Sequence, residues 1–244
     1  MYENIEKVYR KKLLSQKPIL KANDVQLNYI LNYLPKARDI NILDAGCGNG
    51  NYSFYLSSLG YKNISAVDLF SFINTDSFHY QQASIDSLPF DDNHFDFIYS
   101  NSVIYYLENP NDGIKEFKRV LKPNGILIFT AHTKYSLFTL WRLFKRDILK
   151  LKSMEHLKGV KFYSANYYRK LLKKNSFEII LQDGYEVSFF LYPFYKKIVR
   201  GFKKIFNIKL PILNPYINND FGGKIKSEIA YHSVFVVRKI DDKN

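Results

Sequence analysis

The feature that most constrains this chain is a glycine-rich turn between a short apolar strand and a helix. Asn41-Ile42-Leu43 runs into Asp44-Ala45-Gly46-Cys47-Gly48-Asn49-Gly50, and apolar residues at helical spacing follow until Gly60. A second apolar run, Ile64 to Val67, ends in Asp68. These segments predict a β-α-β unit of about thirty residues, in which the glycines let the backbone approach a ligand and the helix N-terminus offers free N–H groups.

The alternation of strands and helices continues along the chain and predicts an α/β fold. Short apolar runs predict further strands, and helical spacing predicts a crossover helix that the turn sequence Pro123-Asn124-Gly125 ends. This pattern is typical of a parallel sheet covered on both faces. The predicted strands are 41–43, 64–67, 79–83, 95–100, 126–130, 177–181 and 233–238, and the predicted helices include 3–34, 111–121 and 165–174.

Length and cysteine content exclude several other classes of protein. A chain of 244 residues is near the upper limit for one hydrophobic core, and no repeat or linker divides it, so we expect a single domain, 1–244. The single cysteine, Cys47, excludes an internal disulfide, and no Cys/His cluster has the spacing of zinc ligands, so no metal is expected. No window has the roughly 18 apolar residues of a spanning helix or the pattern of a signal peptide, which predicts a cytoplasmic protein.

The net charge of +13 is distributed unevenly. Residues 1–130 carry 13 Lys and Arg against 14 Asp and Glu, whereas residues 131–244 carry 23 against 9. Such a surplus fits an anionic ligand, a membrane surface or nucleic acid. A composition rich in Lys, Asn, Ile, Tyr and Phe is also what an AT-rich genome encodes, so the charge alone selects no partner.

Three ordered segments resemble the class I S-adenosylmethionine-dependent methyltransferases. LDAGCGNG resembles their motif I, and SLPFDDNHFDFIYSNSVIYYL with EFKRVLKPNGILIFT resembles the stretch from the adenine pocket through the fourth and fifth strands. The similarity covers about residues 40–131. A nicotinamide-binding domain would show G-x-G-x-x-G instead of G-x-G-x-G. The resemblance implies S-adenosylmethionine as cofactor and a Rossmann-like, doubly wound, seven-stranded, mostly parallel sheet with helical lid insertions.

The resemblance also assigns roles to the residues around the turn. Asp44 would hold the amino group of the cofactor, and the backbone at Gly46 and Gly48 would pass under its methionine portion. Asp68, which follows the second strand at the spacing of a ribose-binding acid, would accept the ribose hydroxyls. The full predicted cofactor set is Asp44, Ala45, Gly46, Cys47, Gly48, Asp68, Leu69, Ser84, Ile85, Asp86, Ser100 and Tyr9.

Some of these positions depart from the family pattern. Ser84 stands where the family often has Asp, which leaves the contact to the adenine amino group open between Ser84 and Asp86. Ser100 would act through its backbone, and Tyr9 would close over the cofactor from the N-terminal helix. Cys47 is read as a small buried residue and not as a nucleophile.

Two residues near the predicted mouth of the sheet are candidates for catalysis. His132 follows the fifth strand, where open α/β sheets bind their ligands, and an imidazole can act as a general base toward a hydroxyl acceptor. A histidine that only forms structural hydrogen bonds in a loop is the competing interpretation. Tyr106 follows the fourth strand and would line the same mouth. The absence of Asn/Asp-Pro-Pro-Tyr/Phe after that strand disfavours methylation of a nucleic-acid base amine.

Two basic segments, 133–163 and 187–228, are predicted insertions that form a lid or acceptor cap. Each contains apolar residues at helical spacing interleaved with Lys and Arg. The apolar faces could pack on the sheet, or the segments could bind a phosphorylated, nucleotide-linked or lipid-linked acceptor, or an anionic membrane surface, or RNA. We therefore expect O-methylation of a small acceptor; the alternatives are a non-catalytic methyltransferase-like scaffold and an RNA methyltransferase.

Overall fold

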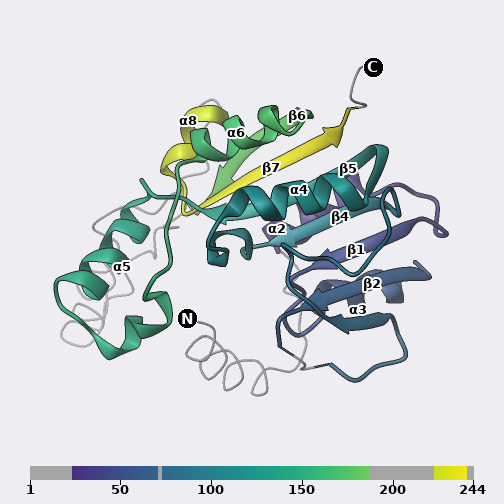
Figure 1. The fold of residues 1–244 in the computed structure, drawn as a ribbon, viewed down its shortest axis with the longest axis horizontal. Helices are drawn as coiled ribbons and strands as arrows, with labels where there is room; N and C mark the ends of the chain where they lie inside the picture. The colour runs from purple at the N-terminus through teal and green to yellow at the C-terminus, as the bar shows by residue number, and fades with distance from the viewer. Residues whose placement is uncertain (1–23, 71–72, 187–222, 241–244) are drawn as a thin grey trace, which may run out of the picture.

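A computed structural model describes residues 24–70, 73–186 and 223–240 (Figure 1). One sheet contains seven strands in the order β3-β2-β1-β4-β5-β7-β6. Tyr9 and residues 187–222 of the second predicted basic segment lie outside the described residues. The strands are β1 (Asn41–Ala45), β2 (Asn63–Asp68), β3 (His79–Gln82), β4 (Phe95–Asn101), β5 (Leu121–His132), β6 (Phe177–Tyr185) and β7 (His232–Lys239). The helices are α2 (Val25–Tyr33), α3 (Asn51–Ser58), α4 (Pro110–Val120), α5 (Leu137–Asp147), α6 (Ala165–Lys174) and α8 (Gly223–Ile229).

The pairing of the strands confirms the predicted seven-stranded, mostly parallel sheet. Strands β1 to β5 run parallel to one another, and β7 lies antiparallel between β5 and β6. Successive strands extend outward from β1 toward β3 and then return to its other side at β4. The strand order therefore reverses between β1 and β4, which is where open α/β sheets form a crevice beyond the carboxyl ends of their strands.

Side chains that alternate along the strands build one core on each face of the sheet. Leu43, Ile98 and Phe129 face the layer that contains α4 and α6. Their neighbours Ile42 and Phe97 face the layer that contains α2 and α3. Because successive residues of a strand point to opposite faces, central strands covered on both sides are apolar at nearly every position.

Polar side chains begin the helices at the residues where their periodic patterns start. The Asp24 carboxylate accepts the N–H of Leu27 at 2.9 Å to cap α2, and Ser136 accepts the N–H of Thr139 at 3.0 Å to cap α5. Ser164 accepts the N–H of Tyr167 at the start of α6. Each cap satisfies one of the N–H groups that the first turn of a helix leaves without an intrahelical partner.

The structure differs from the sequence-based prediction between α4 and β5. Helix α4 ends at Val120, but Pro123-Asn124-Gly125 does not form a separate turn before the strand. Strand β5 already begins at Leu121. Its pairing with β4 shifts register between Phe95, which pairs with Leu121, and Phe97, which pairs with Ile126, so Pro123-Asn124-Gly125 lies within this irregularity of the strand. Asn124 has a φ of 60°, which a short polar side chain tolerates better than most.

Segment 133–163 contains α5 and the 3-10 helix Lys152–Leu157. Figure 1 shows α5 to one side of the sheet, and its larger apolar side chains remain 42–45% exposed. Leu157, Val160 and Phe162 of the same segment are buried in the core that lies against α4 and α6. The exposed apolar side chains of α5 are Leu137, Phe138, Leu140, Trp141 and Phe144. Arg146 joins the two helices by donating to the carbonyls of Leu157 and Val160. No helix in the described ranges is long and apolar enough to cross a membrane.

The two first glycines of the turn provide a matched test of the fold. Both have a positive φ, +83° at Gly46 and +57° at Gly48, but a Cβ on Gly46 would overlap the side chain of Val103, whereas a Cβ on Gly48 would meet nothing within 4 Å. We expect Gly48→Ala to lower the free energy of unfolding by about 1 to 2 kcal/mol through backbone strain alone. Gly46→Ala should lower it by about 2 to 5 kcal/mol because the overlap adds to that strain. Urea unfolding measures both, and equal losses would contradict this account.

Candidate functional site

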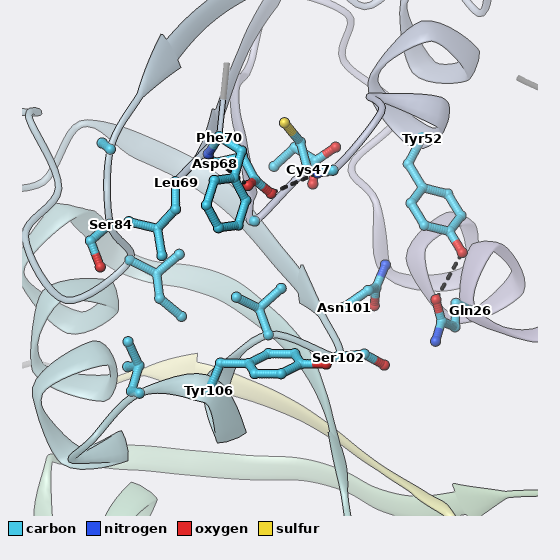
Figure 2. Close-up of a pocket in the computed structure, with 17 residues that line it drawn as sticks. Gln26, Cys47, Tyr52, Asp68, Leu69, Phe70, Ser84, Asn101, Ser102 and Tyr106 are labelled. Carbon is cyan, nitrogen blue, oxygen red and sulfur yellow. Dashed lines mark hydrogen bonds between the residues drawn. The ribbon is translucent and has the colours of Figure 1, made fainter. Parts of the chain in front are cut away.

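A pocket of about 280 Å³ lies at the carboxyl ends of β1 to β4, on both sides of the strand-order reversal (Figure 2). Its walls come from the glycine-rich turn, from the ends of β2, β3 and β4, and from the 3-10 helix Ile104–Tyr106. Side chains of α2 and α3 complete it. The lining residues are Gln26, Asp44, Gly46, Cys47, Gly48, Tyr52, Asp68, Leu69, Phe70, Ala83, Ser84, Ile85, Asn101, Ser102, Val103, Tyr106 and Leu107.

The glycine-rich turn is tied to the end of β2 by three backbone N–H donors. The N–H groups of Gly46 and Cys47 both donate to the carbonyl of Val67, at 2.8 and 2.9 Å. The N–H of Gly48 donates to one oxygen of the Asp68 carboxylate at 2.9 Å, and the N–H of Phe70 donates to the other at 3.2 Å. Burial raises the pKa of Asp68, and these N–H donors oppose that rise. Asp68 is thus held at the pocket wall with further lone pairs available to a ligand.

Asp44, the second acid of the pocket, is almost completely buried, with 3% of its surface exposed. Its carboxylate accepts the hydroxyl of Ser53 at 2.7 Å. Burial raises the pKa of Asp44 to about 7, although hydrogen bonds from Ser53 and Tyr99 oppose the shift. The carboxyl group is therefore balanced between its neutral and ionised forms near neutral pH, and a nearby cation would favour the ionised form.

Asn101, the last residue of β4, presents an amide group without a partner. Its Oδ1 and Nδ2 atoms are both buried and make no hydrogen bond within the described residues. Such atoms cost free energy unless a ligand or water satisfies them, so this side chain marks a place where a polar ligand group would be stabilised. Figure 2 shows Asn101 between the turn and the Ser102–Tyr106 wall.

Several lining residues were missed by sequence reasoning. Tyr52 on α3 donates its hydroxyl to Gln26 on α2 at 2.8 Å, and this pair closes one end of the pocket. Neither residue has a motif signal, because the tertiary packing of two helices brings them together. Phe70 directly follows the predicted Leu69, and Asn101 directly follows the predicted Ser100.

The structure brings most of the predicted residues together. Nine of them line the pocket: Asp44, Gly46, Cys47, Gly48, Asp68, Leu69, Ser84, Ile85 and Tyr106. Ala45, Asp86, Ser100 and His132 do not line it. The hydroxyl of Ser84 donates to the carboxylate of Asp86, so Asp86 stands directly behind a lining residue. Cys47 is buried, and burial raises the pKa of its thiol, so the thiol is not activated as a nucleophile.

His132 lies at the end of β5, within an aromatic stack. Its ring is 4.0 Å from the ring of Tyr231 and 4.3 Å from that of Tyr105, measured between centroids. Burial lowers the pKa of His132 well below its ordinary value, and the neighbouring His232 and Arg142 lower it further. Tyr105 also lies 4.5 Å from Tyr106, so one aromatic ring separates His132 from the pocket wall. Its role as the base stays a prediction.

The charges of the described lining are all negative. Asp44 and Asp68 are its ionisable acids, and no Lys, Arg or His is among the residues that line the pocket. The rest of the wall is apolar or aromatic. Such a pocket favours a ligand that carries a positive charge together with hydroxyl groups, and it disfavours an anionic group close to the two acids.

The raised pKa of Asp44 makes a prediction about stability. From its ordinary value of 3.8 up to about pH 7 the unfolded chain ionises this carboxyl while the folded protein keeps it protonated, so wild-type stability falls as pH rises toward and through 7. Asp44→Asn should remove this loss. We expect the variant to gain stability over the wild type by an amount that grows by roughly 2 kcal/mol between pH 5 and pH 8.

Thermal or urea unfolding at both pH values measures the difference. Asp91→Asn, which changes an exposed aspartate, serves as the matched control and should show no comparable change with pH. If the difference in unfolding free energy between Asp44→Asn and the wild type is the same at pH 5 and pH 8, Asp44 is ionised in the folded protein throughout this range.

Comparison with known proteins finds similarity over the part of the chain that provides most of the pocket lining. Residues 43–129 match the family model described as a methyltransferase domain. A malonyl-[acyl-carrier protein] O-methyltransferase of Enterobacter lignolyticus is 34% identical over 104 residues, 40% of this chain and 41% of that protein. A tRNA U34 carboxymethyltransferase of Nautilia profundicola is 33% identical over 98 residues, 36% of this chain and 33% of that protein. The matches thus span less than half the length of these curated relatives.

A solved structure extends the similarity of fold beyond the matched residues. An S-adenosylmethionine-dependent methyltransferase from Thermotoga maritima superposes with a TM-score of 0.59, covering 98% of this chain and 94% of that chain at 19% identity. At this identity the match supports the fold and not the activity. Family model, curated relatives and fold agree with the motifs at the carboxyl ends of β1, β2 and β4. Residues 43–129 are therefore similar to a methyltransferase domain, and the fold of the described residues is that of the solved methyltransferase structure.

Proposed function

We propose that the protein binds S-adenosylmethionine in the pocket and transfers its methyl group to an oxygen atom of a small acceptor. The observation that carries the proposal is the pair of acids at the switch point, with Asp68 clamped by the N–H groups of Gly48 and Phe70 and Asp44 buried beneath the turn. When bound, S-adenosylmethionine supplies a methyl group on a positively charged sulfonium, whose sulfur is a good leaving group.

The residues present fit this cofactor. Its ribose offers hydroxyls to the lone pairs of Asp68, and its amino group offers a cation to Asp44. Its adenine needs apolar walls, which Leu69, Phe70 and Ile85 provide. The unpartnered amide of Asn101 is available to the polar atoms of the amino-acid part. A pocket with two acids and no described cation also suits the positive sulfonium better than it suits an anion.

The remaining predicted cofactor residues keep supporting roles in this proposal. Gly46 and Cys47 present the backbone of the turn, which Ala45 continues from β1. Ser100 contributes the end of β4 through its backbone. Ser84 lines the pocket at the position predicted to contact the adenine amino group. Its hydroxyl donates to the carboxylate of Asp86, which orients it.

Oxygen is the acceptor atom that the observations support best. The curated relatives with the most similar sequences include O-methyltransferases, and the stretch after β4 lacks the motif of base-amine methyltransferases. Tyr106 lines the acceptor side of the pocket, and His132 stands one aromatic ring behind it. Segments 133–163 and 187–228 are proposed to cap this side; the described part carries Lys145 and Arg146 on α5.

Removal of Asp68 tests the proposed cofactor site. Asp68→Ala deletes the acceptor of the ribose hydroxyls, so it should weaken binding of S-adenosylhomocysteine by about 1.5 to 3 kcal/mol, measured by titration calorimetry. Asp91→Ala, at an exposed aspartate, is the control and should bind as the wild type does. Wild-type affinity in Asp68→Ala would mean that another group holds the ribose.

The pKa of Asp44 predicts the pH dependence of the same binding. Only the ionised carboxylate attracts the ligand's amino group, and the pKa of about 7 leaves most of the carboxyl protonated at pH 6. S-Adenosylhomocysteine should therefore bind about tenfold more weakly at pH 6 than at pH 8. In Asp44→Asn the affinity should be low and independent of pH over this range. An equally steep pH dependence in Asp44→Asn would assign the titrating group elsewhere.

A further inference from the structure

Ser102, His232 and Glu186 form a side-chain array at the wall of the pocket, and the proposed function does not use it. Ser102 lines the pocket directly after β4. Its Oγ lies 3.2 Å from Nδ1 of His232, the first residue of β7. On the other side of the ring, Nε2 of His232 lies 3.4 Å from a carboxylate oxygen of Glu186. The two ring nitrogens thus face a hydroxyl and a carboxylate.

The order of these groups defines which nitrogen carries the proton. An ionised carboxylate only accepts hydrogen bonds, so Glu186 favours the tautomer in which Nε2 is protonated. Nδ1 then presents its lone pair to the hydroxyl of Ser102, and the hydroxyl donates. This direction of hydrogen bonding activates a hydroxyl group. The carboxylate orients the imidazole, and the imidazole accepts from the serine, which lies on the ligand side.

The fold holds both ends of the array in backbone conformations that few residues adopt. Ser102 and Glu186 each have a φ of 60°, in the left-handed region. The N–H of Ser102 is held by the carbonyl and the side-chain oxygen of Thr130, at 3.2 and 3.0 Å. Backbone strain at non-glycine residues persists only where the surroundings enforce it, and it concentrates at functional sites.

The β-sheet places His232 between two other aromatic residues. It pairs with His132 on β5 and with Tyr185 on β6, directly across the ladder. The Tyr185 ring stacks on His232 with centroids 4.6 Å apart, whereas His132 and Tyr231 meet it edge to face at 4.5 and 4.6 Å. The His232 ring is therefore held on its faces and edges as well as by its two nitrogens.

The charged groups around His232 differ in effect. His132 has a pKa far below its ordinary value because it is buried, so it stays neutral and does not repel a proton on His232. Arg142 lies 5.9 Å from the ring centroid of Tyr231 and disfavours a second positive charge. Tyr185 keeps its hydroxyl proton, since burial raises its pKa. Glu186, 38% exposed, is the nearest group that stabilises an imidazolium.

We infer that His232 is the base of the proposed transfer and that it acts through Ser102 on a hydroxyl acceptor. The inference rests on the proposed function. The acceptor O–H bond breaks and its electron pair stays on the acceptor oxygen, while its proton moves to Oγ of Ser102. Ser102 passes its own proton to Nδ1 of His232, and Glu186 balances the resulting positive charge. Ser102 is the catalytic residue here, and His232 and Glu186 act through it.

This arrangement also defines the class of acceptor. A carboxylate acceptor is already ionised at neutral pH and needs no base, and it would be repelled by Asp44 and Asp68 in the same pocket. A hydroxyl is neutral, and it requires removal of a proton as its oxygen attacks. The array therefore favours an alcohol or phenol as the methyl acceptor.

The histidine tautomer is a first test that needs no acceptor. Protein labelled with ¹⁵N-histidine is examined by long-range ¹H–¹⁵N correlation at pH 8, with His232 assigned from the spectrum of His232→Asn. We expect His232 to carry its proton on Nε2 in the wild type and to lose this preference in Glu186→Gln. Predominant protonation of Nδ1 in the wild type would overturn the inference.

The reactivity of Ser102 toward diisopropyl fluorophosphate is the second test. In this reaction the bond between Oγ and phosphorus forms, the P–F bond breaks with loss of fluoride, and the hydroxyl proton goes to His232. Mass spectrometry of peptides should locate the adduct on Ser102. We expect His232→Asn to slow labelling at least about 100-fold and Glu186→Gln to slow it about tenfold. His79→Asn, at an exposed histidine of β3, should label as the wild type does.

Binding of S-adenosylhomocysteine by the same variants separates this inference from the proposed function. Unchanged affinity and an unchanged melting temperature in His232→Asn, together with lost labelling, support the array. Wild-type protein that binds S-adenosylhomocysteine but is not labelled at Ser102 overturns the array and leaves the proposed function intact. Labelling without any binding of S-adenosylhomocysteine overturns the proposed function and, with it, the assignment of the array to methyl transfer.

Discussion

The hydrogen bonds between the glycine-rich turn and the end of β2 are the constraint on which the pocket depends. Two N–H groups of the turn share the carbonyl of Val67, and a third holds Asp68. These contacts require the backbone to pass close to β2 with positive φ at Gly46 and Gly48, where a side chain would be strained. The turn therefore keeps the crevice between β1 and β4 open and gives the Asp68 carboxylate a defined orientation.

The electrostatics of the pocket follow from burial. Two carboxyl groups lie in a wall that is otherwise apolar, and burial raises the pKa of both. A protein that keeps such groups loses stability as pH rises from the ordinary pKa of aspartate toward the raised pKa of the folded state, because over this range only the unfolded chain ionises them. A cationic ligand with hydroxyl groups offsets this cost, so the same acids that weaken the free protein strengthen binding of such a ligand.

The chain divides its charges between the two sides of the proposed reaction. The acidic and neutral residues of β1 to β4 surround the cofactor pocket, whereas the surplus of Lys and Arg lies in residues 131–244. In the described part of that half, α5 keeps apolar side chains exposed, and its cations Arg142, Lys145 and Arg146 are half-buried. The ends of β5, β7 and β6 contribute an aromatic layer, in which His132 and His232 are paired across the ladder.

The sequence by itself determined the α/β class, the order of the seven strands along the chain and the acids of the pocket, because these depend on local periodicity and on glycines at defined spacing. It also located nine of the residues that line the pocket, since these residues lie at or shortly after the ends of β1 to β4. The sequence did not predict the extension of β5 through Pro123, because long-range strand pairing outweighs a local turn signal. Only the tertiary structure decided that Gln26 meets Tyr52 and that Ser102 meets His232, 130 residues later. Such contacts arise where strands distant in sequence become neighbours in the sheet, and no local pattern records them.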